Sequence, residues 1–239
     1  MRSLIGMTAV MAVGGITGAA APAAEKTADY SFDYSYPQEA ARIPALRAWL
    51  EADKARLRTQ TARDAAQERV EARDGGYPFR PYDTQKTWKL VTDTPRFLSL
   101  SGDVYSYTGG AHGTPGSMGL LWDKAAGKRI APKLVFSSLP AAQDVIGPAF
   151  CAKLKAERRR RIGAAAASDG MFATCPTLKD LTVLLGSSGG GRFNRIGLIA
   201  DPYVAGSYAE GAYEVTLPVT RALIGAVKPE YRAAFAVGR

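Results

Sequence analysis

Hydrophobic and polar residues alternate along several segments of the chain, a pattern typical of strands with one buried face. Over residues 29–36, Tyr30, Phe32, Tyr34 and Tyr36 alternate with polar neighbours, and Pro37 ends the run. The same period of two returns from Thr84, and residues Thr94 and Pro95 interrupt it, which predicts two antiparallel strands. Further strands are expected at 119–122, 128–130, 181–185, 193–200 and 213–217.

Helical spacing of apolar residues marks two longer segments. Residues 44–70 carry Leu46, Trp49, Leu50 and Leu57 at this spacing, and the second half of the segment is mostly polar, so we expect it on the surface. Glycines at 75 and 76 should end that helix. A second amphipathic helix is expected at 140–161, and a short helical region, broken at Pro229, at 219–235.

Strands and helices are segregated along the chain rather than strictly alternating, and this predicts an α+β architecture. We expect antiparallel sheets, a long N-terminal helix and a second amphipathic helix. No polar linker or internal repeat divides residues 25–239, so two small subdomains should pack together.

The first 24 residues are typical of a secretory signal peptide. Arg2 provides the positive start, residues 4–20 are weakly apolar, and small residues at 21–24 suit cleavage. An uncleaved anchor is the alternative, but no later apolar run is long enough to span a membrane. The sequence therefore predicts a periplasmic or secreted protein without a membrane span after cleavage.

The two cysteines, Cys151 and Cys175, fit this location. In an oxidising compartment an isolated pair is expected to form a disulfide, while two buried free thiols are the alternative.

The chain carries a formal charge of +9, which becomes about +8 when Arg2 leaves with the signal. Such a charge favours anionic surroundings. Residues 157–161 hold four consecutive arginines at the expected end of the second helix. We interpret them as a solvated helix end, with contact to an anionic envelope component as the alternative; nucleic acid is not an expected partner.

The motif at 106–113 follows a strand and places three glycines around His112, the only histidine of the chain. The imidazole could serve as a general base or ligand. Alternatively, it hydrogen-bonds backbone groups that the glycines leave exposed, and this structural interpretation is the one we favour.

A single histidine also restricts the chemistry. Zinc sites need two or three histidine or cysteine ligands, and both cysteines are expected to be bonded to each other, so we predict neither a metal nor another cofactor. No Gly-x-Ser-x-Gly elbow accompanies His112. The glycine-rich segment 186–193 imitates a phosphate-binding loop but has Arg192 and Phe193 at its decisive positions, which indicates a strand connection.

A third cluster lies at 201–211, where Tyr203 and Tyr208 stand among glycines before a strand. Exposed tyrosines on such a loop can stack on sugars or anchor an interface. Burial of both rings against the adjacent sheet is the alternative.

Together, the motifs at 106–113 and 202–211 and the following Val215-Thr216-Leu217-Pro218 resemble the family that pairs a DUF4163 (PdaC-type) region with a DUF3298 (RsiV-like) region. The resemblance covers most of the mature chain and implies a division into residues 25–115 and 116–239. Ser207 departs from the family pattern, in which proline is common at that position.

The resemblance implies a role at the cell wall, since such families include the non-catalytic part of a peptidoglycan deacetylase and the extracellular part of a lysozyme-sensing anti-sigma factor. We expect an exported, non-catalytic binding module for peptidoglycan, an anionic envelope component or an envelope protein. The alternatives are a wall hydrolase using His112, and a structural or lysozyme-binding envelope protein without signalling function. The candidate binding residues are Tyr107, Thr108, Gly109, Gly110, His112, Gly113, Tyr203 and Tyr208.

Overall fold

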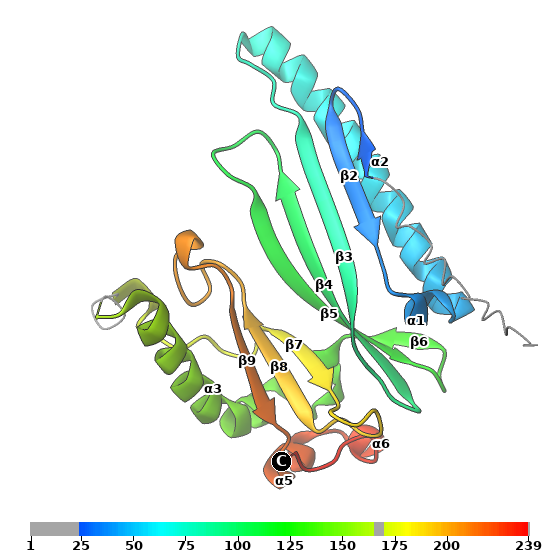
Figure 1. The fold of residues 1–239 in the computed structure, drawn as a ribbon, viewed down its shortest axis with the longest axis vertical. Coiled ribbons are helices and arrows are strands. Elements are labelled where there is room, and N and C mark those ends of the chain that lie inside the picture. Colours follow the sequence, from blue (N-terminus) through cyan, green and yellow to red (C-terminus); the bar gives the residue numbers. More distant parts are fainter. Residues whose placement is uncertain (1–23, 165–169, 239) are drawn as a thin grey trace, which may run out of the picture.

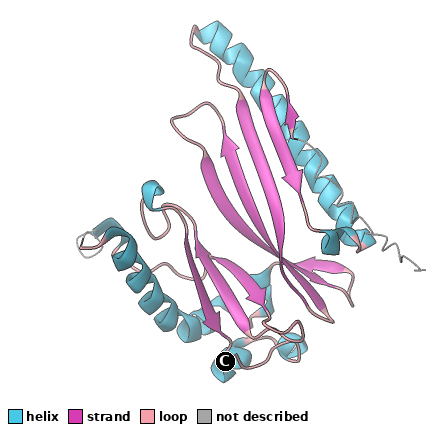
Figure 2. Cartoon of the chain, in the orientation of Figure 1, coloured by secondary structure: helices cyan, strands magenta, loops and turns pink. Residues whose placement is uncertain are grey.

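The computed structural model describes residues 24–164 and 170–238. The expected signal peptide, residues 1–24, therefore lies outside the described residues apart from its last alanine. Figure 1 shows two sheets, each covered on one side by a long helix, and Figure 2 shows the same elements by type.

The larger sheet has six strands in the order of the chain. All neighbouring strands are antiparallel except β2 and β3, which run parallel. Parallel neighbours need a long crossover, and here two helices provide it. The strands are β1 (Glu25–Lys26), β2 (Tyr30–Ser35), β3 (Tyr82–Asp93), β4 (Phe97–Tyr107), β5 (Thr114–Asp123) and β6 (Lys128–Ile130).

The crossover consists of α1 (Gln38–Ala41) and α2 (Pro44–Gly75), and α2 covers one face of the larger sheet (Figure 1). The alternation predicted for β2 is confirmed, since Tyr30, Phe32 and Tyr34 are buried. They pack in one cluster with Leu46 and Leu50 of α2.

Most residues in the second half of α2 are exposed, as expected, but three small ones are buried. Thr61, Ala65 and Ala72 are buried there, and the Thr61 hydroxyl donates to Thr84 of β3 over 3.0 Å. These small residues allow the helix to approach the sheet closely without a large apolar stripe. The helix runs five residues beyond the expected end and stops at Gly76, whose φ of 70° is the left-handed conformation that glycine adopts readily.

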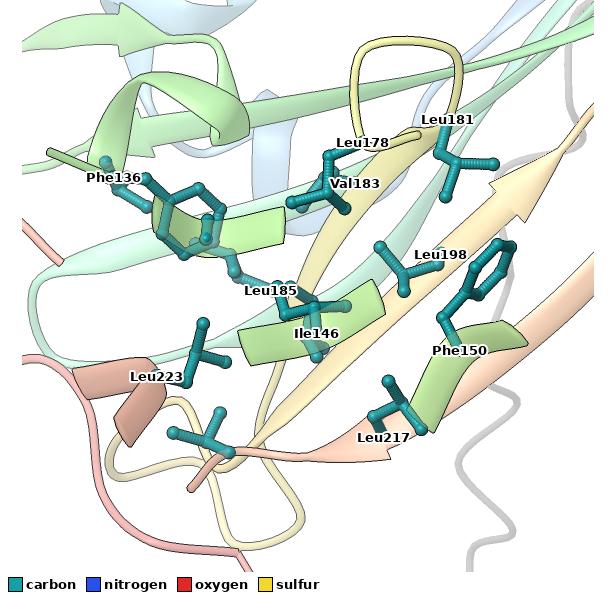
Figure 3. Close-up of a cluster of buried hydrophobic side chains, with 14 of the residues drawn as sticks. Phe136, Ile146, Phe150, Leu178, Leu181, Val183, Leu185, Leu198, Leu217 and Leu223 are labelled. Atoms are coloured by element: carbon teal, nitrogen blue, oxygen red, sulfur yellow. The ribbon is translucent and has the colours of Figure 1, made fainter. Parts of the chain in front are cut away.

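The smaller sheet consists of β7 (Thr182–Gly186), β8 (Arg195–Ala200) and β9 (Tyr213–Pro218), all antiparallel. It is covered by α3 (Leu139–Ile162), while α5 (Arg221–Ala226) and α6 (Pro229–Arg232) close its lower end (Figure 1). Short helical turns lie at η1 (Pro132–Val135), η2 (Gly170–Phe172) and η3 (Tyr208–Glu210). Figure 3 shows the core between α3, α5 and the sheet, which includes Ile146, Phe150, Leu185, Leu198 and Leu217.

The two sheets meet where β5 passes β7. A side chain on Gly119 of β5 would lie 2.5 Å from the Val183 carbonyl oxygen, so only glycine permits this approach. Ser117 connects the sheets further: its N–H donates to Asp201 over 3.0 Å, and its carbonyl accepts from Thr182 over 2.9 Å. Beside Ser117, Pro115 has no N–H to offer. The backbone groups of Ser117 on this edge of β5 are thus occupied by side chains, and at Pro115 the edge lacks a donor.

Cys151 of α3 and Cys175 form the expected disulfide, with Cα atoms 5.8 Å apart. The α+β class and the two principal helices are likewise confirmed. The division near residue 115 stays a prediction; that position lies within β5, which pairs with β4 throughout its length. None of the helices in the described part of the chain is long and apolar enough to cross a membrane.

Candidate functional site

A cleft of about 600 Å³ lies between the larger sheet and the end of the smaller one. One wall comes from the face of β3 and β4 that points away from α2, where Gln85, Thr87 and Lys89 follow each other at a period of two. The opposite wall comes from the segment between β8 and β9 and from β9 itself. This wall includes Asp201, Tyr208 and Glu214.

The charged residues of the cleft lining are Lys89, Asp103, Asp201 and Glu214, so carboxylates outnumber cations there. The Lys89 ammonium lies 2.5 Å from Asp103, and this carboxylate raises the pKa of Lys89. The lining is therefore acidic although the chain as a whole is basic. This local charge favours neutral or amine-bearing ligands over anionic ones.

Three rings gather at the mouth of the cleft and bring together the two motifs found in the sequence. The His112 imidazole stacks on Tyr208, with ring centroids 4.0 Å apart and planes inclined by 25°. The Tyr203 ring lies 6.0 Å from Tyr208 between centroids, and its hydroxyl is 3.5 Å from Nε2 of His112. We call His112, Tyr203 and Tyr208 the ring cluster. Tyr208 belongs both to this cluster and to the cleft lining.

His112 makes a backbone contact of the kind that the structural interpretation expects. Its Nδ1 lies 2.9 Å from the Gly113 carbonyl oxygen. Since a carbonyl only accepts, Nδ1 is the donor in this contact, and Nε2 faces the Tyr203 hydroxyl. A general base is normally oriented by a carboxylate, whereas here a neutral carbonyl takes that place. Within the described residues, no group of three histidine, cysteine, aspartate or glutamate side chains could hold a metal ion.

The glycines of the first motif have different roles. Gly109 adopts a φ of 89°, a conformation that residues with a side chain rarely take. Gly113 has ordinary dihedral angles but is buried beneath Tyr105, whose ring would lie 2.2 Å from an added Cβ. Tyr105 lines the cleft, so Gly113 makes room for one of its walls.

The remaining candidate residues of the first motif do not join the ring cluster. The Gly109 and Gly110 carbonyls accept from Arg80 at 3.4 and 3.3 Å. Tyr107 is the last residue of β4, opposite Asp83 of β3, and Thr108 is exposed. The structure therefore brings His112 together with Tyr203 and Tyr208, but directs Gly109 and Gly110 toward Arg80.

Tyr203 has an unusual backbone conformation. Its φ is 71°, and among the described residues it is the only non-glycine with a positive φ. The side chain is 59% exposed, so burial does not explain the strain. Strained residues of this kind occur preferentially at functional sites. Burial of both tyrosines, the alternative drawn from the sequence, is wrong for Tyr203.

Glu210 organises the loop that carries Tyr208. Its carboxylate accepts from the Ser207 N–H at 2.7 Å and from the Tyr213 hydroxyl at 2.5 Å. Burial raises the pKa of Glu210, but these hydrogen bonds and the nearby Arg158 more than compensate, so its pKa lies below the ordinary value. Gly206 is required beside it, because an added Cβ would lie 2.6 Å from the carboxylate.

Part of the arginine run at 158–161 supports the same loop, so the expectation of a solvated helix end is wrong for Arg158 and holds for the other three. Arg158 is 5% exposed and forms an ion pair with Glu210 at 3.7 Å. Arg161 donates to the carbonyls of Glu210 and Ala212, both over 2.8 Å, and lies over the Tyr213 ring. Arg159, Arg160 and Arg161 are exposed as expected, although Arg161 also contacts this loop.

The polar side chains of the cleft lining carry no distinctive signal in the sequence. The period-two pattern of Gln85, Thr87 and Lys89 was visible, but it marks a solvated face equally well. Only the position of the second sheet over that face turns it into a wall.

Comparison with known proteins agrees with part of the resemblance. Residues 23–114 match the family model described as Deacetylase PdaC, in agreement with the resemblance of the N-terminal region. No curated protein matches the sequence of the chain.

Two solved structures are similar to the chain. One is a DUF3298 family protein from Pseudomonas aeruginosa PAO1, with 21% identity and a TM-score of 0.45 over 66% of each chain, just under two thirds of that protein. The other is a DUF3298 family member from Bacteroides fragilis, with 17% identity, a TM-score of 0.45 and coverage of 76% of this chain and 70% of that one. The RsiV-like character of the second half stays a prediction.

Proposed function

We propose that the chain is a non-catalytic binding module of the cell envelope, and that its ligand is a glycan strand of the wall. The ring cluster supports this most strongly. Pyranose rings have flat apolar faces that stack on aromatic rings, and Tyr208 presents such a ring at the edge of a polar cleft. The exposed Tyr203 extends the stacking surface beyond the cleft.

The cleft lining suits the hydroxyl-rich edges of the same ligand. Carboxylates and amides accept and donate the hydrogen bonds that orient a sugar, and Gln85, Asp201 and Glu214 supply them here. One oxygen of Asp201 already accepts from Ser117, which fixes its carboxylate in place. The acidic lining disfavours anionic wall polymers, so the glycan of peptidoglycan fits better than a polyphosphate chain.

Three observations support placement in the envelope. The disulfide suits an oxidising compartment, the N-terminal region is PdaC-like, and the first 24 residues are typical of a signal peptide. We therefore propose a periplasmic or secreted location.

The proposal can be tested by measuring binding of the exported chain to purified peptidoglycan and to glycan fragments released from it. Tyr208→Ala and Tyr203→Ala should each weaken binding by about tenfold, in the range of an exposed aromatic anchor. Tyr77→Ala is the matched control, since Tyr77 is an exposed tyrosine outside the cleft lining and ring cluster. Equal affinity of all three variants and the wild type would contradict the proposal.

Two further arms separate the alternatives. A basic protein such as lysozyme would also be drawn to an acidic cleft, so purified lysozyme is tested as a competing ligand; binding of lysozyme without glycan would replace our proposal. For the hydrolase alternative, release of wall fragments is measured for wild type and His112→Ala. Turnover that disappears in a folded His112→Ala protein would establish an enzyme.

A further inference from the structure

Arg158 occupies an unusual position for a charged side chain. It lies in the last turns of α3, is 5% exposed, and sits between two segments that are distant in sequence. Arginine is rarely buried to this extent unless it is paired, because removing its charge from water is unfavourable. The residues that Arg158 contacts therefore show which two segments of the chain it joins.

On one side Arg158 contacts the loop of the ring cluster. Its Nε lies 3.7 Å from Oε2 of Glu210, and the side chain of Glu210 is 7% exposed. Glu210 in turn binds the backbone of Ser207, directly before Tyr208. A charge at Arg158 thus fixes the carboxylate that shapes the turn from which Tyr208 projects onto His112.

On its other side Arg158 binds the segment that the disulfide attaches to α3. Its Nη1 donates to the Phe172 carbonyl over 3.0 Å, and its guanidinium lies 5.9 Å from the Phe172 ring. Phe172 ends the short turn η2, three residues before Cys175. The disulfide joins Cys175 to Cys151 on α3, two turns before Arg158, and all four residues line one small pocket.

We propose that Arg158 is a positioning residue for the ring cluster, and that the Cys151–Cys175 disulfide is what holds its Phe172 acceptor in place. Loss of either one removes the ion pair from Glu210 and leaves only its hydrogen bonds to Ser207 and Tyr213, so the turn shifts and Tyr208 stacks less closely on His112. The effect on ring geometry stands independently, whereas the accompanying loss of ligand affinity rests on the proposed function.

The chain offers a direct reporter of this geometry. His112 is its only histidine, so the imidazole protons give a single set of signals in a proton or ¹H–¹³C NMR spectrum. Tyr208→Ala supplies the chemical shift of an imidazole without its stacking partner. In Arg158→Gln, and in the double variant Cys151→Ala with Cys175→Ala, we expect the His112 signals to move toward that reference.

Arg160→Gln is the matched control. Arg160 lies on the same helix, its side chain is 78% exposed, and it pairs with Glu157 rather than with the loop. Its His112 signals should remain at the wild-type position. Arg158→Lys keeps the charge but has a single ammonium for two separated acceptors, so it should give an intermediate shift.

Wild-type His112 signals in folded Arg158→Gln and in the folded disulfide variant would overturn the inference. If Arg158→Gln does not fold, Arg158→Lys and Glu210→Gln provide the same comparison, and unchanged signals in both would overturn it equally. Glycan affinity is measured in parallel. Signals that move as expected in a protein that binds no glycan would reject the proposed function while leaving the positioning role intact.

Discussion

Lys86 of β3 donates a hydrogen bond of 2.7 Å to Asp53 of α2, and less than a tenth of the surface of each side chain is exposed. Asp53 also accepts from the Tyr34 hydroxyl, which itself accepts from the Trp88 indole. The ammonium lies 4.9 Å from the Trp88 ring centroid. This polar network joins α2 to the sheet in the middle of an otherwise apolar contact.

Removal of the Asp53 charge should destabilise the protein strongly. Asp53→Asn leaves Lys86 buried without its counterion, which typically lowers the free energy of unfolding by roughly 3–5 kcal/mol. Urea denaturation measures this change. Asp64→Asn, which affects a more exposed carboxylate of the same helix, is the control and should change stability by less than about 1 kcal/mol.

The same network predicts how stability depends on pH. Burial raises the pKa of Asp53, but hydrogen bonds from Lys86, Arg56 and Tyr34 more than compensate, so its pKa in the folded protein lies below the ordinary value. Its contribution to stability is present above the unfolded pKa of about 4 and is lost as the pH falls through the folded pKa. Wild type should therefore lose more stability than Asp53→Asn between about pH 5 and pH 2. Parallel pH profiles would contradict this assignment.

Gly113→Ala should damage the wall of the cleft that Tyr105 forms. An added methyl group must displace Tyr105 from its wall of the cleft. We expect affinity for the wall glycan to fall several-fold and stability to fall by about 1–3 kcal/mol. Gly110→Ala is the control, because its nearest neighbour outside the adjoining residues is a backbone oxygen at 4.0 Å. Equal glycan affinities of the two variants would exclude Tyr105 from the site.

Gly119→Ala should disturb the contact between the sheets. Its methyl group would press on the Val183 carbonyl, a backbone atom that cannot move away as a side chain can. Thermal unfolding should show a loss of about 1–3 kcal/mol. Gly116→Ala on the same strand has no atom within 4 Å of the added carbon and should be nearly neutral, so similar melting temperatures for both variants would disprove this role.

The Cys151–Cys175 disulfide should contribute about 3 kcal/mol to stability, as expected for closing a loop of this size. Replacing both cysteines with alanine removes the crosslink without leaving thiols, and guanidinium denaturation then measures the loss. Wild type treated with a dithiol reductant serves as a second comparison. A double variant as stable as the oxidised protein would contradict the estimate.

Local patterns predicted most elements because each depends on a few neighbouring residues. The alternation of Tyr30, Phe32 and Tyr34 marked β2, and Gly76 marked the end of α2. The burial of Lys86 and Arg158 could not be predicted in this way, because it depends on residues far along the chain. Both are charged side chains buried by partners far along the chain, Asp53 and Glu210, and no local pattern reveals such a partner.

The candidate site was predictable only in part. Its two motifs were recognised separately from their glycines and rings, and Tyr203 and His112, which meet, are 91 positions apart. The parallel pairing of β2 with β3 was not foreseen, since hydrophobic alternation does not encode strand direction. The polar wall formed by Gln85 and Thr87 likewise became visible only with the second sheet in place.

Fibril growth through strand addition needs a free row of backbone donors and acceptors on one molecule that a second molecule can match. On the upper half of β5 that row is broken, because the carboxylate of Asp201 and the hydroxyl of Thr182 already occupy Ser117, and Pro115 has nothing to donate. A second copy of this chain therefore meets no free backbone donor at positions 115 and 117 of that strand, and Pro115, Ser117 and Asp201, which line the cleft, also protect this edge from strand pairing.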